Sequence, residues 1–317
     1  MRIFNELLIV TGLSSPDLMR LIVSAPMRYK TYQIPKKNKG WRTIAQPSKE
    51  VKILQRAIQS LILDSCIVHS SATAYEPGTS ISKNAEVHAQ NRVILKLDFR
   101  AFFPSIKPVD WRKYAKEKLD LDDQSISVCE YVLFWGGGFR KPAFLSIGAP
   151  TSPKLSNILM YDLDVQFARI CKDHHVDYTR YADDITLSGQ SIEALVEVEK
   201  QIAVVLSKAP YPKLTFNGEK RGLYTKKARR SVTGLNITPQ GHLSLGRERK
   251  RIISSMIHKY TLGILPIEEL YTLKGLLAFA LDNEPAFVNR MSIKYGSDAV
   301  KKLQKLHIPS RADRVKS

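Results

Sequence analysis

The chain has 317 residues, of which 44% are hydrophobic, so it can bury a core as one large domain or as two or three closely packed subdomains. Its 49 Lys and Arg residues exceed its 30 Asp and Glu residues by 19 charges, and such an excess is typical of proteins that bind a polyanion. No segment reaches the ~18 consecutive apolar residues of a membrane span. The scattered residues Cys66, Cys129 and Cys171 argue against disulfide and zinc classes and favour a cytoplasmic protein.

The first part of the chain predicts helices around a basic hairpin. Ser15-Pro16 before DLMRLIVSA is typical of a capped helix start. RYKTYQI and WRTIAQ follow as two strands joined by the tip PKKNKG. A further helix is expected to start near Ser80. Between the hairpin and that helix, one more helix should carry an apolar stripe of Val51, Leu54, Ile58 and Leu61.

The middle of the chain predicts a strand and a hairpin that both carry acids. RVILKLDF alternates as a strand whose far end holds Asp98, and VDYTRYADDITLSG predicts a hairpin with its bend at Ala182-Asp183. Helices are expected over 122–135 and from Ser152-Pro153 to about Lys172. Ser191 opens another helix, with an apolar face of Leu195, Val198, Ile202 and Val205.

Short strands around LTF, GLY and SVTGLNI precede a C-terminal part of about 70 residues that is mostly helical and basic. Strands and helices therefore mix without regular βαβ alternation, which predicts an α+β fold with a helical C-terminal subdomain.

Three carboxylates are predicted to carry the chemistry. Adjacent side chains on a strand point to opposite faces, so Asp183 and Asp184 can share one site only where the pleat breaks, as at a bend. If Asp98 joins them, the three carboxylates repel one another and keep a proton unless divalent cations are bound. Oxygen ligands without nearby His or Cys favour Mg²⁺, and two such ions support template-directed nucleotidyl transfer. A solvated Asp-Asp turn is the plain alternative.

Basic residues are concentrated between Tyr211 and Arg251, where only Glu219 and Glu248 are acidic. Nucleic acid is the first candidate partner for this stretch, an anionic membrane surface is the second, and an ordinary basic soluble protein is the plain alternative. The basic residues are Lys213, Lys220, Arg221, Lys226, Lys227, Arg229, Arg230, Arg247, Arg249, Lys250 and Arg251.

Several segments, in order along nearly the whole chain, resemble the motifs of reverse transcriptases. GWRTIAQPSKEVKILQ and YEPGTSISKNA resemble the two fingers motifs, and LKLDFRAFFPSI resembles the palm strand with the first metal aspartate. GAPTSPKLSN is similar to the following loop and helix, YTRYADDITLS to the YxDD hairpin, and LTFNGEK, with Asn217 and Lys220, to the next motif. The resemblance implies a right-hand polymerase fold with fingers, an antiparallel palm sheet that carries the carboxylates, and a helical thumb.

Two shorter matches resemble the retron class of bacterial reverse transcriptases. Asn84-Ala85-Glu86-Val87-His88 fits the N-A-x-x-H signature, and Asn84 and His88 would share a helix face. Val232-Thr233-Gly234 fits the V-T-G signature, which in the family helps to engage structured RNA. The plain alternatives are a helix surface and a tight strand end.

The resemblance assigns roles residue by residue. Asp98, Asp183 and Asp184 match the catalytic triad that binds two Mg²⁺ ions, with Mn²⁺ as a substitute, and the Phe99 carbonyl adds a metal ligand. Arg42, Lys37 and Lys39 match residues that hold the incoming triphosphate, and Phe103 matches an aromatic gate against the ribose 2′-OH. RNA binding is assigned to Asn84, His88, Val232, Thr233 and Gly234, and to the basic residues Lys226, Lys227, Arg229, Arg230, Arg247, Arg249 and Arg251. Ile147 departs from the family, which commonly has Gln there.

The implied organisation is N-terminal helices and fingers over 1–92, the first part of the palm over 93–111, a fingers–palm connection over 112–150, the second part of the palm over 151–238 and a helical basic thumb over 239–317. The implied activity is RNA-directed DNA polymerisation on a cognate structured noncoding RNA, primed from an RNA 2′-OH and giving a branched RNA–DNA product.

The implied partners are that RNA, the nascent single-stranded DNA, deoxynucleoside triphosphates and an effector protein of a phage-defence system, with no membrane. A separate RNase H is expected, since only a thumb-sized tail follows the palm. A group II intron-like or diversity-generating reverse transcriptase, and a non-catalytic RNA-binding scaffold, remain the alternatives. The two retron signatures speak against the first, and the three intact aspartates speak against the second.

Overall fold

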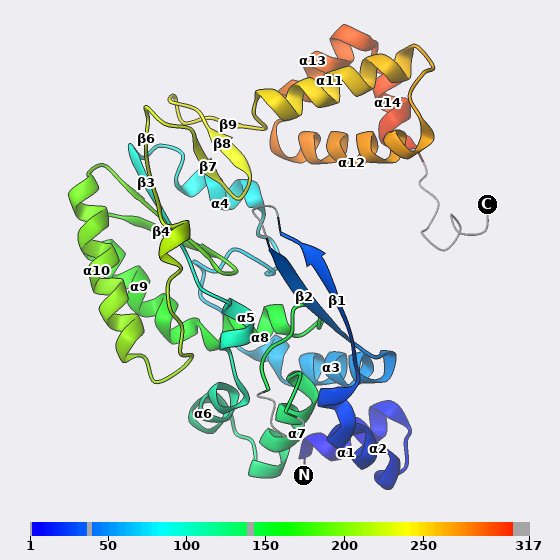
Figure 1. Cartoon of the computed structure of the whole chain (residues 1–317), viewed down its shortest axis with the longest axis vertical. Coiled ribbons are helices and arrows are strands. Elements are labelled where there is room, and N and C mark those ends of the chain that lie inside the picture. Colours follow the sequence, from blue (N-terminus) through cyan, green and yellow to red (C-terminus); the bar gives the residue numbers. More distant parts are fainter. Residues whose placement is uncertain (1, 37–39, 138–142, 307–317) are drawn as a thin grey trace. The chain divides into compact units, whose positions relative to one another are not determined.

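The computed structural model describes residues 2–36, 40–137 and 143–306 (Figure 1). The chain divides into two compact units, one formed by Met1–Ser80 with Arg92–Leu223 and the other by Ile81–Asn91 with Tyr224–Ser317. In the described ranges no single helix is long and apolar enough to span a membrane; the only candidate there is a pair, 2–11 with 15–27, bent by 107°.

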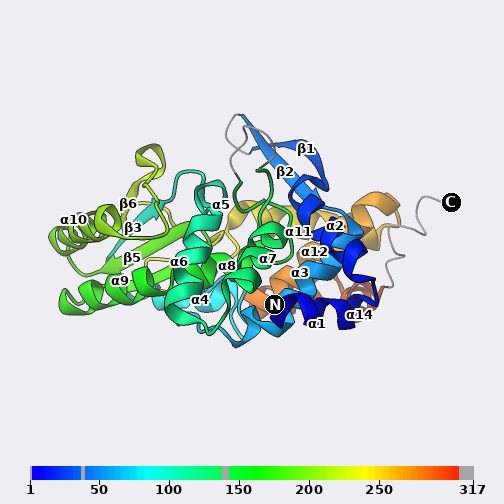
Figure 2. The same ribbon diagram turned by 90° about the horizontal axis from the view of Figure 1, so that it is seen from below.

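The first unit opens with helices that pack around α3. α1 (Arg2–Thr11) and α2 (Ser15–Ser24) contact α3 (Lys49–Leu61) and α7 (Asp123–Leu133), and both views show these helices side by side (Figures 1 and 2). The short helices η1 (Ala25–Met27) and η2 (Leu63–Ser65) follow α2 and α3. Val51, Leu54 and Ile58 of the predicted stripe are fully buried, whereas Leu61 at the helix end is 37% exposed.

A hairpin of β1 (Tyr29–Pro35) and β2 (Trp41–Pro47) separates these helices and is antiparallel, with Ile34 opposite Arg42. The end of the hairpin away from its tip is held by the segment before residue 150, because the Ala45 N–H donates to the Ile147 carbonyl at 2.9 Å. The predicted strands are therefore confirmed, and the hairpin is anchored at the end opposite its tip.

A four-stranded sheet with strand order β4-β5-β3-β6 forms the centre of the first unit, and β5 pairs antiparallel with both of its neighbours. β3 (Val93–Asp98) is almost wholly buried, β4 (Asp177–Tyr181) and β5 (Asp184–Gly189) form the predicted hairpin, and β6 (Gly222–Thr225) begins in this unit. α9 (Tyr161–Asp173) packs against β4, α10 (Ile192–Lys208) packs against β5, and the two helices contact each other. The buried faces of these elements join one apolar core.

Shorter helices complete this unit: α5 (Phe102–Ser105), α6 (Pro108–Lys118), α8 (Ser152–Leu159) and η3 (Gly218–Lys220). α6 packs against α7 and α8. α5 follows the end of β3 directly and begins after Ala101, whose φ is 47°.

The second unit contains a small sheet and a helical part. α4 (Ile81–Val87) packs against β7 (Arg230–Val232), β8 (Leu235–Ile237) and β9 (Leu243–Ser244), which form an antiparallel sheet in that order. The helical part consists of α11 (Arg247–Thr261), α12 (Ile267–Asn283), α13 (Pro285–Tyr295) and α14 (Ser297–Lys305). The mixed, non-alternating order confirms the predicted α+β class.

Two predicted helix boundaries were wrong. Ser14, rather than Ser15, caps α2, because its hydroxyl oxygen accepts the Asp17 N–H at 3.3 Å. The long helix expected from Ser152 is two helices that meet at Met160. Leu159 and Leu163 are buried on either side of that break, so the apolar spacing runs through it and conceals it.

Candidate active site

Asp98, Asp183 and Asp184 meet at one end of the central sheet of the first unit. Antiparallel pairing of β3 with β5 places Asp98 opposite Asp184, and the Phe99 N–H donates to the Asp183 carbonyl at 3.1 Å. Asp183 lies in the bend between β4 and β5, directly after Ala182, whose φ is 56°. Carboxylates from two distant segments of the sequence therefore converge.

Packing fixes the position of this bend. Ile185 and Leu187 on β5 are fully buried and Tyr178 on β4 is 7% exposed, so both arms of the hairpin are held by the apolar core. The acids follow where the alternation is interrupted, and the left-handed backbone at Ala182 turns Asp183 out of the regular pleat. Buried residues on the two strands thus anchor the hairpin, and the acids lie at its bend.

Burial and neighbouring carboxyl groups raise the pKa values of Asp183 and Asp184. Burial, followed by the charge of Asp98, raises the pKa of Asp183. Burial, followed by the charge of Asp183 and a hydrogen bond with Asp98, raises the pKa of Asp184 to about 6. Without a bound cation, this cluster therefore keeps protons at a pH at which an isolated aspartate is ionised.

Lys220 supplies part of the missing positive charge. Its Nζ lies 2.7 Å from Oδ2 of Asp98, which is itself almost buried, and the Asn217 N–H donates to the Asp98 carbonyl at 2.7 Å. The other carboxylate oxygen, Oδ1 of Asp98, is buried without a hydrogen-bond partner in the described part of the chain. The LTFNGEK motif thus reaches the acids through both its backbone and its side chain.

The three carboxylates fit a divalent metal ion in charge and in donor chemistry. Two of them have raised pKa values, and a third has a buried oxygen without a partner, so the cluster is short of positive charge. Hard carboxylate oxygens suit Mg²⁺ and Mn²⁺. In the ranges that the structure describes, no three His, Cys, Asp or Glu side chains are grouped closely enough to hold an ion.

A cavity of about 400 Å³ lies in the same unit. The predicted gate residue Phe103 lines it, half-buried and edge-on to Phe102 with ring centroids 5.4 Å apart. Ile147 also lines it, at the position where the family commonly has Gln. The remaining lining residues are Lys52, Arg56, Tyr75, Ser146, Gly148, Ala149, Pro150, Ser152 and Pro153.

Tyr75, Lys52 and Arg56 were not predicted as site residues. Tyr75 has a φ of 67° and is 51% exposed, and the charge of Asp183 helps burial to raise its pKa. Its sequence signal was its place inside YEPGTSISKNA. Lys52 and Arg56 are four residues apart on α3, so they share a face, but only the fold shows that this face borders a cavity.

The predicted triphosphate ligands come from the β1–β2 hairpin. Arg42 is exposed on β2, and its positive charge slightly offsets the rise in the pKa of Asp183 and of Tyr75, so it acts on the carboxylate cluster electrostatically. Lys37 and Lys39 lie outside the described residues.

The two retron signatures lie together within the second unit. Thr233-Gly234 forms the two-residue turn between β7 and β8 with φ values of 46° and 81°, as a primed hairpin turn requires. The Thr233 hydroxyl donates to the Ile81 carbonyl at 2.9 Å and lies 3.5 Å from Nδ2 of Asn84. Asn84, His88 and Val232 are 1%, 0% and 0% exposed, so their side chains offer no surface to RNA. Of these, Asn84 approaches the turn from the interior, through the Thr233 hydroxyl.

The predicted basic RNA-binding residues divide into two groups. Arg230 is buried and donates to the carbonyls of Asn91 and Thr238, so its guanidinium links β7 to the segments that follow α4 and β8. Arg249 is half-buried, with its guanidinium 4.7 Å from the centroid of the Phe279 ring. The exposed ones are Lys226, Lys227, Arg229, Arg247 and Arg251.

Known proteins resemble this chain along most of its length. The family described as "Reverse transcriptase (RNA-dependent DNA polymerase)" matches residues 34–237. A retron Ec83 reverse transcriptase of Escherichia coli is 37% identical over 294 residues, covering 92% of this chain and 94% of the relative. A retron Ec86 reverse transcriptase of the same species is 30% identical over 305 residues, covering 92% and 90%.

Among solved structures, a telomerase from Candida albicans in complex with a fragment of telomeric RNA overlaps with a TM-score of 0.49 at 13% identity, covering 91% of this chain and 56% of that one. That overlap is too weak to support any conclusion. The family match spans well over half of the chain, and the bacterial relatives match almost end to end. The chain therefore belongs to the retron reverse transcriptases and is an RNA-directed DNA polymerase.

Proposed function

We propose that this polymerase copies a cognate structured noncoding RNA, starts from a 2′-OH within that RNA and leaves a branched RNA–DNA product. The observation that carries the proposal is the convergence of Asp98 with Asp183 and Asp184, in a sheet position where burial and mutual charge raise two of their pKa values. The resemblance to retron enzymes over almost the whole chain supports the choice of template and primer.

Two Mg²⁺ ions, with Mn²⁺ as a substitute, would be held by the three carboxylates and the backbone carbonyl of Phe99. When bound, such ions lower the pKa of an attacking hydroxyl and neutralise charge on the departing pyrophosphate. Asp98 is kept in place by Lys220 and by the Asn217 N–H, and the buried strands hold the bend that carries the other two acids.

The cavity beside Phe103 would take the sugar and base of the incoming deoxynucleoside triphosphate. A half-buried ring that lines this cavity can exclude a ribose 2′-OH by contact. Arg42, with Lys37 and Lys39, would hold the triphosphate, since a guanidinium binds phosphate oxygens in pairs. Ile147 cannot donate the hydrogen bond that the family's Gln provides, so this chain relies on shape at that wall.

RNA would bind along the exposed basic residues of the second unit, supported by the V-T-G turn. Lys226 and Lys227 are exposed just before β7, and Arg247 and Arg251 are exposed on α11. Thr233 and Gly234 would present their backbone to the RNA, while the buried Asn84 and His88 would act from the interior, with Asn84 beside the Thr233 hydroxyl.

We also infer the setting. The three described cysteines are free and buried, as suits a reducing cytoplasm. A separate RNase H would remove the copied template, and an effector protein would couple the nascent single-stranded DNA to phage defence.

The experiment is purification of the protein from its own host, followed by sequencing of the co-purified nucleic acid before and after RNase and debranching treatment. The proposal predicts one abundant RNA linked to one DNA whose 5′ end is released only by debranching. DNA that starts from a free 3′-OH, or no discrete RNA at all, would contradict the proposed primer and template.

A further inference from the structure

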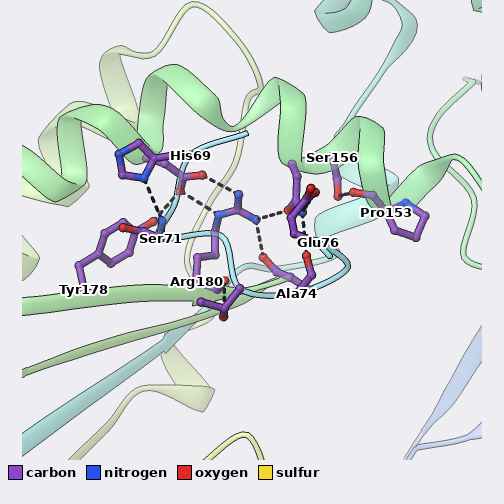
Figure 3. Close-up of polar contacts among 12 residues, drawn as sticks. His69, Ser71, Ala74, Glu76, Pro153, Ser156, Tyr178 and Arg180 are labelled. Atoms are coloured by element: carbon purple, nitrogen blue, oxygen red, sulfur yellow. Dashed lines mark hydrogen bonds and ion pairs between the residues drawn. The ribbon is translucent and has the colours of Figure 1, made fainter. Parts of the chain in front are cut away.

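A buried ion pair lies next to the β4–β5 bend that carries Asp183. Arg180 on β4 and Asp164 on α9 are both completely buried, with Nε donating to Oδ1 at 2.9 Å and Nη2 to Oδ2 at 2.6 Å (Figure 3). The Tyr178 hydroxyl donates to the same carboxylate at 2.6 Å. A buried ion pair is weak evidence for stability, because desolvation offsets much of the attraction. Its geometry therefore calls for another explanation.

The third guanidinium nitrogen reaches the bend itself. Nη1 of Arg180 donates to the Ala182 carbonyl at 3.1 Å, and Ala182 immediately precedes Asp183. Ala182 is not glycine but has a φ of 56°, a left-handed conformation that is unfavourable for an ordinary residue and persists only where surrounding contacts enforce it. Arg180 makes such a contact, since its guanidinium is fixed by two carboxylate oxygens.

The same nitrogen continues to a second part of the site. Nη1 lies 3.1 Å from Oδ1 of Asn157 on α8, and Nδ2 of Asn157 donates to the Ala74 carbonyl at 2.8 Å and to Oε1 of Glu76 at 3.0 Å (Figure 3). These two acceptors flank Tyr75, the exposed residue with φ of 67° that lines the cavity. The Asn157 amide therefore holds the backbone before Tyr75 and the side chain of the residue after it.

The backbone of Arg180 completes the connection. Its N–H donates to the Ser71 carbonyl at 2.7 Å, and its carbonyl accepts the Thr73 N–H at 2.8 Å, so the loop that leads to Tyr75 runs along β4. Lys154 adds an ion pair to Glu76 at 2.9 Å. One buried side chain thus contacts both the peptide that carries the aspartates and the residue that clamps the Tyr75 loop.

We propose that Arg180 is a positioning residue for DNA synthesis, which through the Ala182 carbonyl sets the metal-binding geometry of Asp183 and Asp184 and through Asn157 sets the wall of the nucleotide cavity at Tyr75. This inference rests on the catalytic role proposed for those aspartates. A purely structural role predicts lost stability alone; a positioning role predicts changed metal binding and turnover in a folded protein.

The test is Arg180→Lys in the full-length protein. Lysine keeps the charge beside Asp164, but a single ammonium cannot serve the carboxylate, Ala182 and Asn157 together. Displacement of the acids by about 1 Å is expected to lower kcat by about 10- to 100-fold. Mn²⁺ binding, measured by electron paramagnetic resonance without substrates, should weaken by about tenfold, and the circular dichroism spectrum should stay that of the wild type.

Asn157→Ser is the second variant, and it leaves the ion pair intact. It releases the Tyr75 loop, so the KM for the deoxynucleotide should rise by about tenfold with a smaller change in kcat. Arg112→Lys is the matched control, because Arg112 forms a similar two-nitrogen pair with Glu130 between α6 and α7. It should leave kcat, KM and Mn²⁺ binding unchanged.

The outcomes are separable. If Asp183→Asn retained DNA synthesis, the proposed catalytic assignment would fail, whatever Arg180 does. If Asp183→Asn were inactive while folded Arg180→Lys kept wild-type kcat and Mn²⁺ binding, the positioning role would be refuted. If Arg180→Lys did not fold, a wild-type KM for the deoxynucleotide in Asn157→Ser would refute the proposal, because the proposal includes the connection through Asn157 to Tyr75.

Discussion

At the scale of single residues, Asp184 shows how a carboxylate of the candidate site can destabilise the folded protein when it is ionised. Its carboxyl is held beside Asp183 and Asp98, and burial and charge raise its pKa to about 6. The folded protein therefore binds this proton more tightly than the unfolded chain does, so the contribution to stability is present at low pH and is lost as the pH rises from about 4 through about 6.

Asp184→Asn removes that penalty. In EDTA, the Tm of the variant should exceed that of the wild type by an amount that grows between pH 4 and pH 7 and then levels off. Thermal unfolding followed by circular dichroism across this range measures it, and Asp120→Asn, at an exposed acid, is the control. A Tm difference that does not change with pH would show that Asp184 is not perturbed as described.

Phe103 is the second residue whose role can be isolated. Phe103→Ala opens the wall of the cavity, so incorporation of ribonucleotides relative to deoxynucleotides should rise by about 10- to 100-fold. Primer extension with matched nucleotide pairs gives the ratio of kcat/KM values. If that ratio stays constant while the Tm falls, the ring serves packing alone.

At the scale of elements, the loop before α8 depends on its approach to β2. Gly148 has a φ of 122°, and a Cβ there would lie 3.0 Å from the Ala45 carbonyl oxygen and 3.1 Å from Cγ2 of Ile44. The close approach is possible because the Ala45 N–H already holds the neighbouring Ile147 carbonyl. The β1–β2 hairpin and this wall of the cavity are therefore held against each other by their backbones.

Gly148→Ala should destabilise the protein by about 1–3 kcal/mol and raise the KM for the deoxynucleotide. Gly275→Ala is the control: it lies within α12, nothing would lie within 4 Å of its Cβ, and alanine should stabilise the helix by about 0.5–1 kcal/mol. Denaturant unfolding measures both. Equal effects of the two substitutions would contradict the close approach.

Elements whose apolar spacing ends at a clear boundary could be predicted from the sequence. The β4–β5 hairpin is an example, because apolar residues such as Tyr178 and Ile185 flank a bend that carries two acids. The break at Met160 could not be predicted, since burial continues through it. Site residues that match a motif, such as Asp98, could also be predicted from the sequence.

The role of Arg180 could not be predicted from the sequence. It depends on hydrogen bonds from this one strand residue to α8, to α9 and to the Ala182 carbonyl, and only the fold brings these together. Arg230 illustrates the opposite limit. It lies among exposed basic residues in the sequence, yet the fold buries it against two backbone carbonyls. Charge clustering alone cannot tell a surface arginine from an interior one.

At the scale of the whole molecule, the excess of 19 positive charges favours a polyanion partner. Neutralising three exposed residues of the second unit together, Lys226→Gln, Lys227→Gln and Arg247→Gln, should weaken RNA binding and reduce the slope of log K against log salt by up to about 2–3, since each lost phosphate contact removes about 0.7–0.9.

The control neutralises Lys172, Lys200 and Lys208, which are exposed on α9 and α10. It changes the net charge equally and should leave the slope almost unchanged. If both triple variants reduced the slope alike, the RNA would be responding to total charge rather than to this surface.

The central claim is that Asp98, Asp183 and Asp184 carry out RNA-templated DNA synthesis, and labelled deoxynucleotide incorporation on the co-purified RNA tests it most directly. Asp98→Asn and Asp183→Asn should each reduce incorporation by about a thousandfold, equivalent to about 4 kcal/mol of lost transition-state stabilisation, while keeping the wild-type fold and RNA content. Incorporation at the wild-type rate by either folded variant would contradict the account.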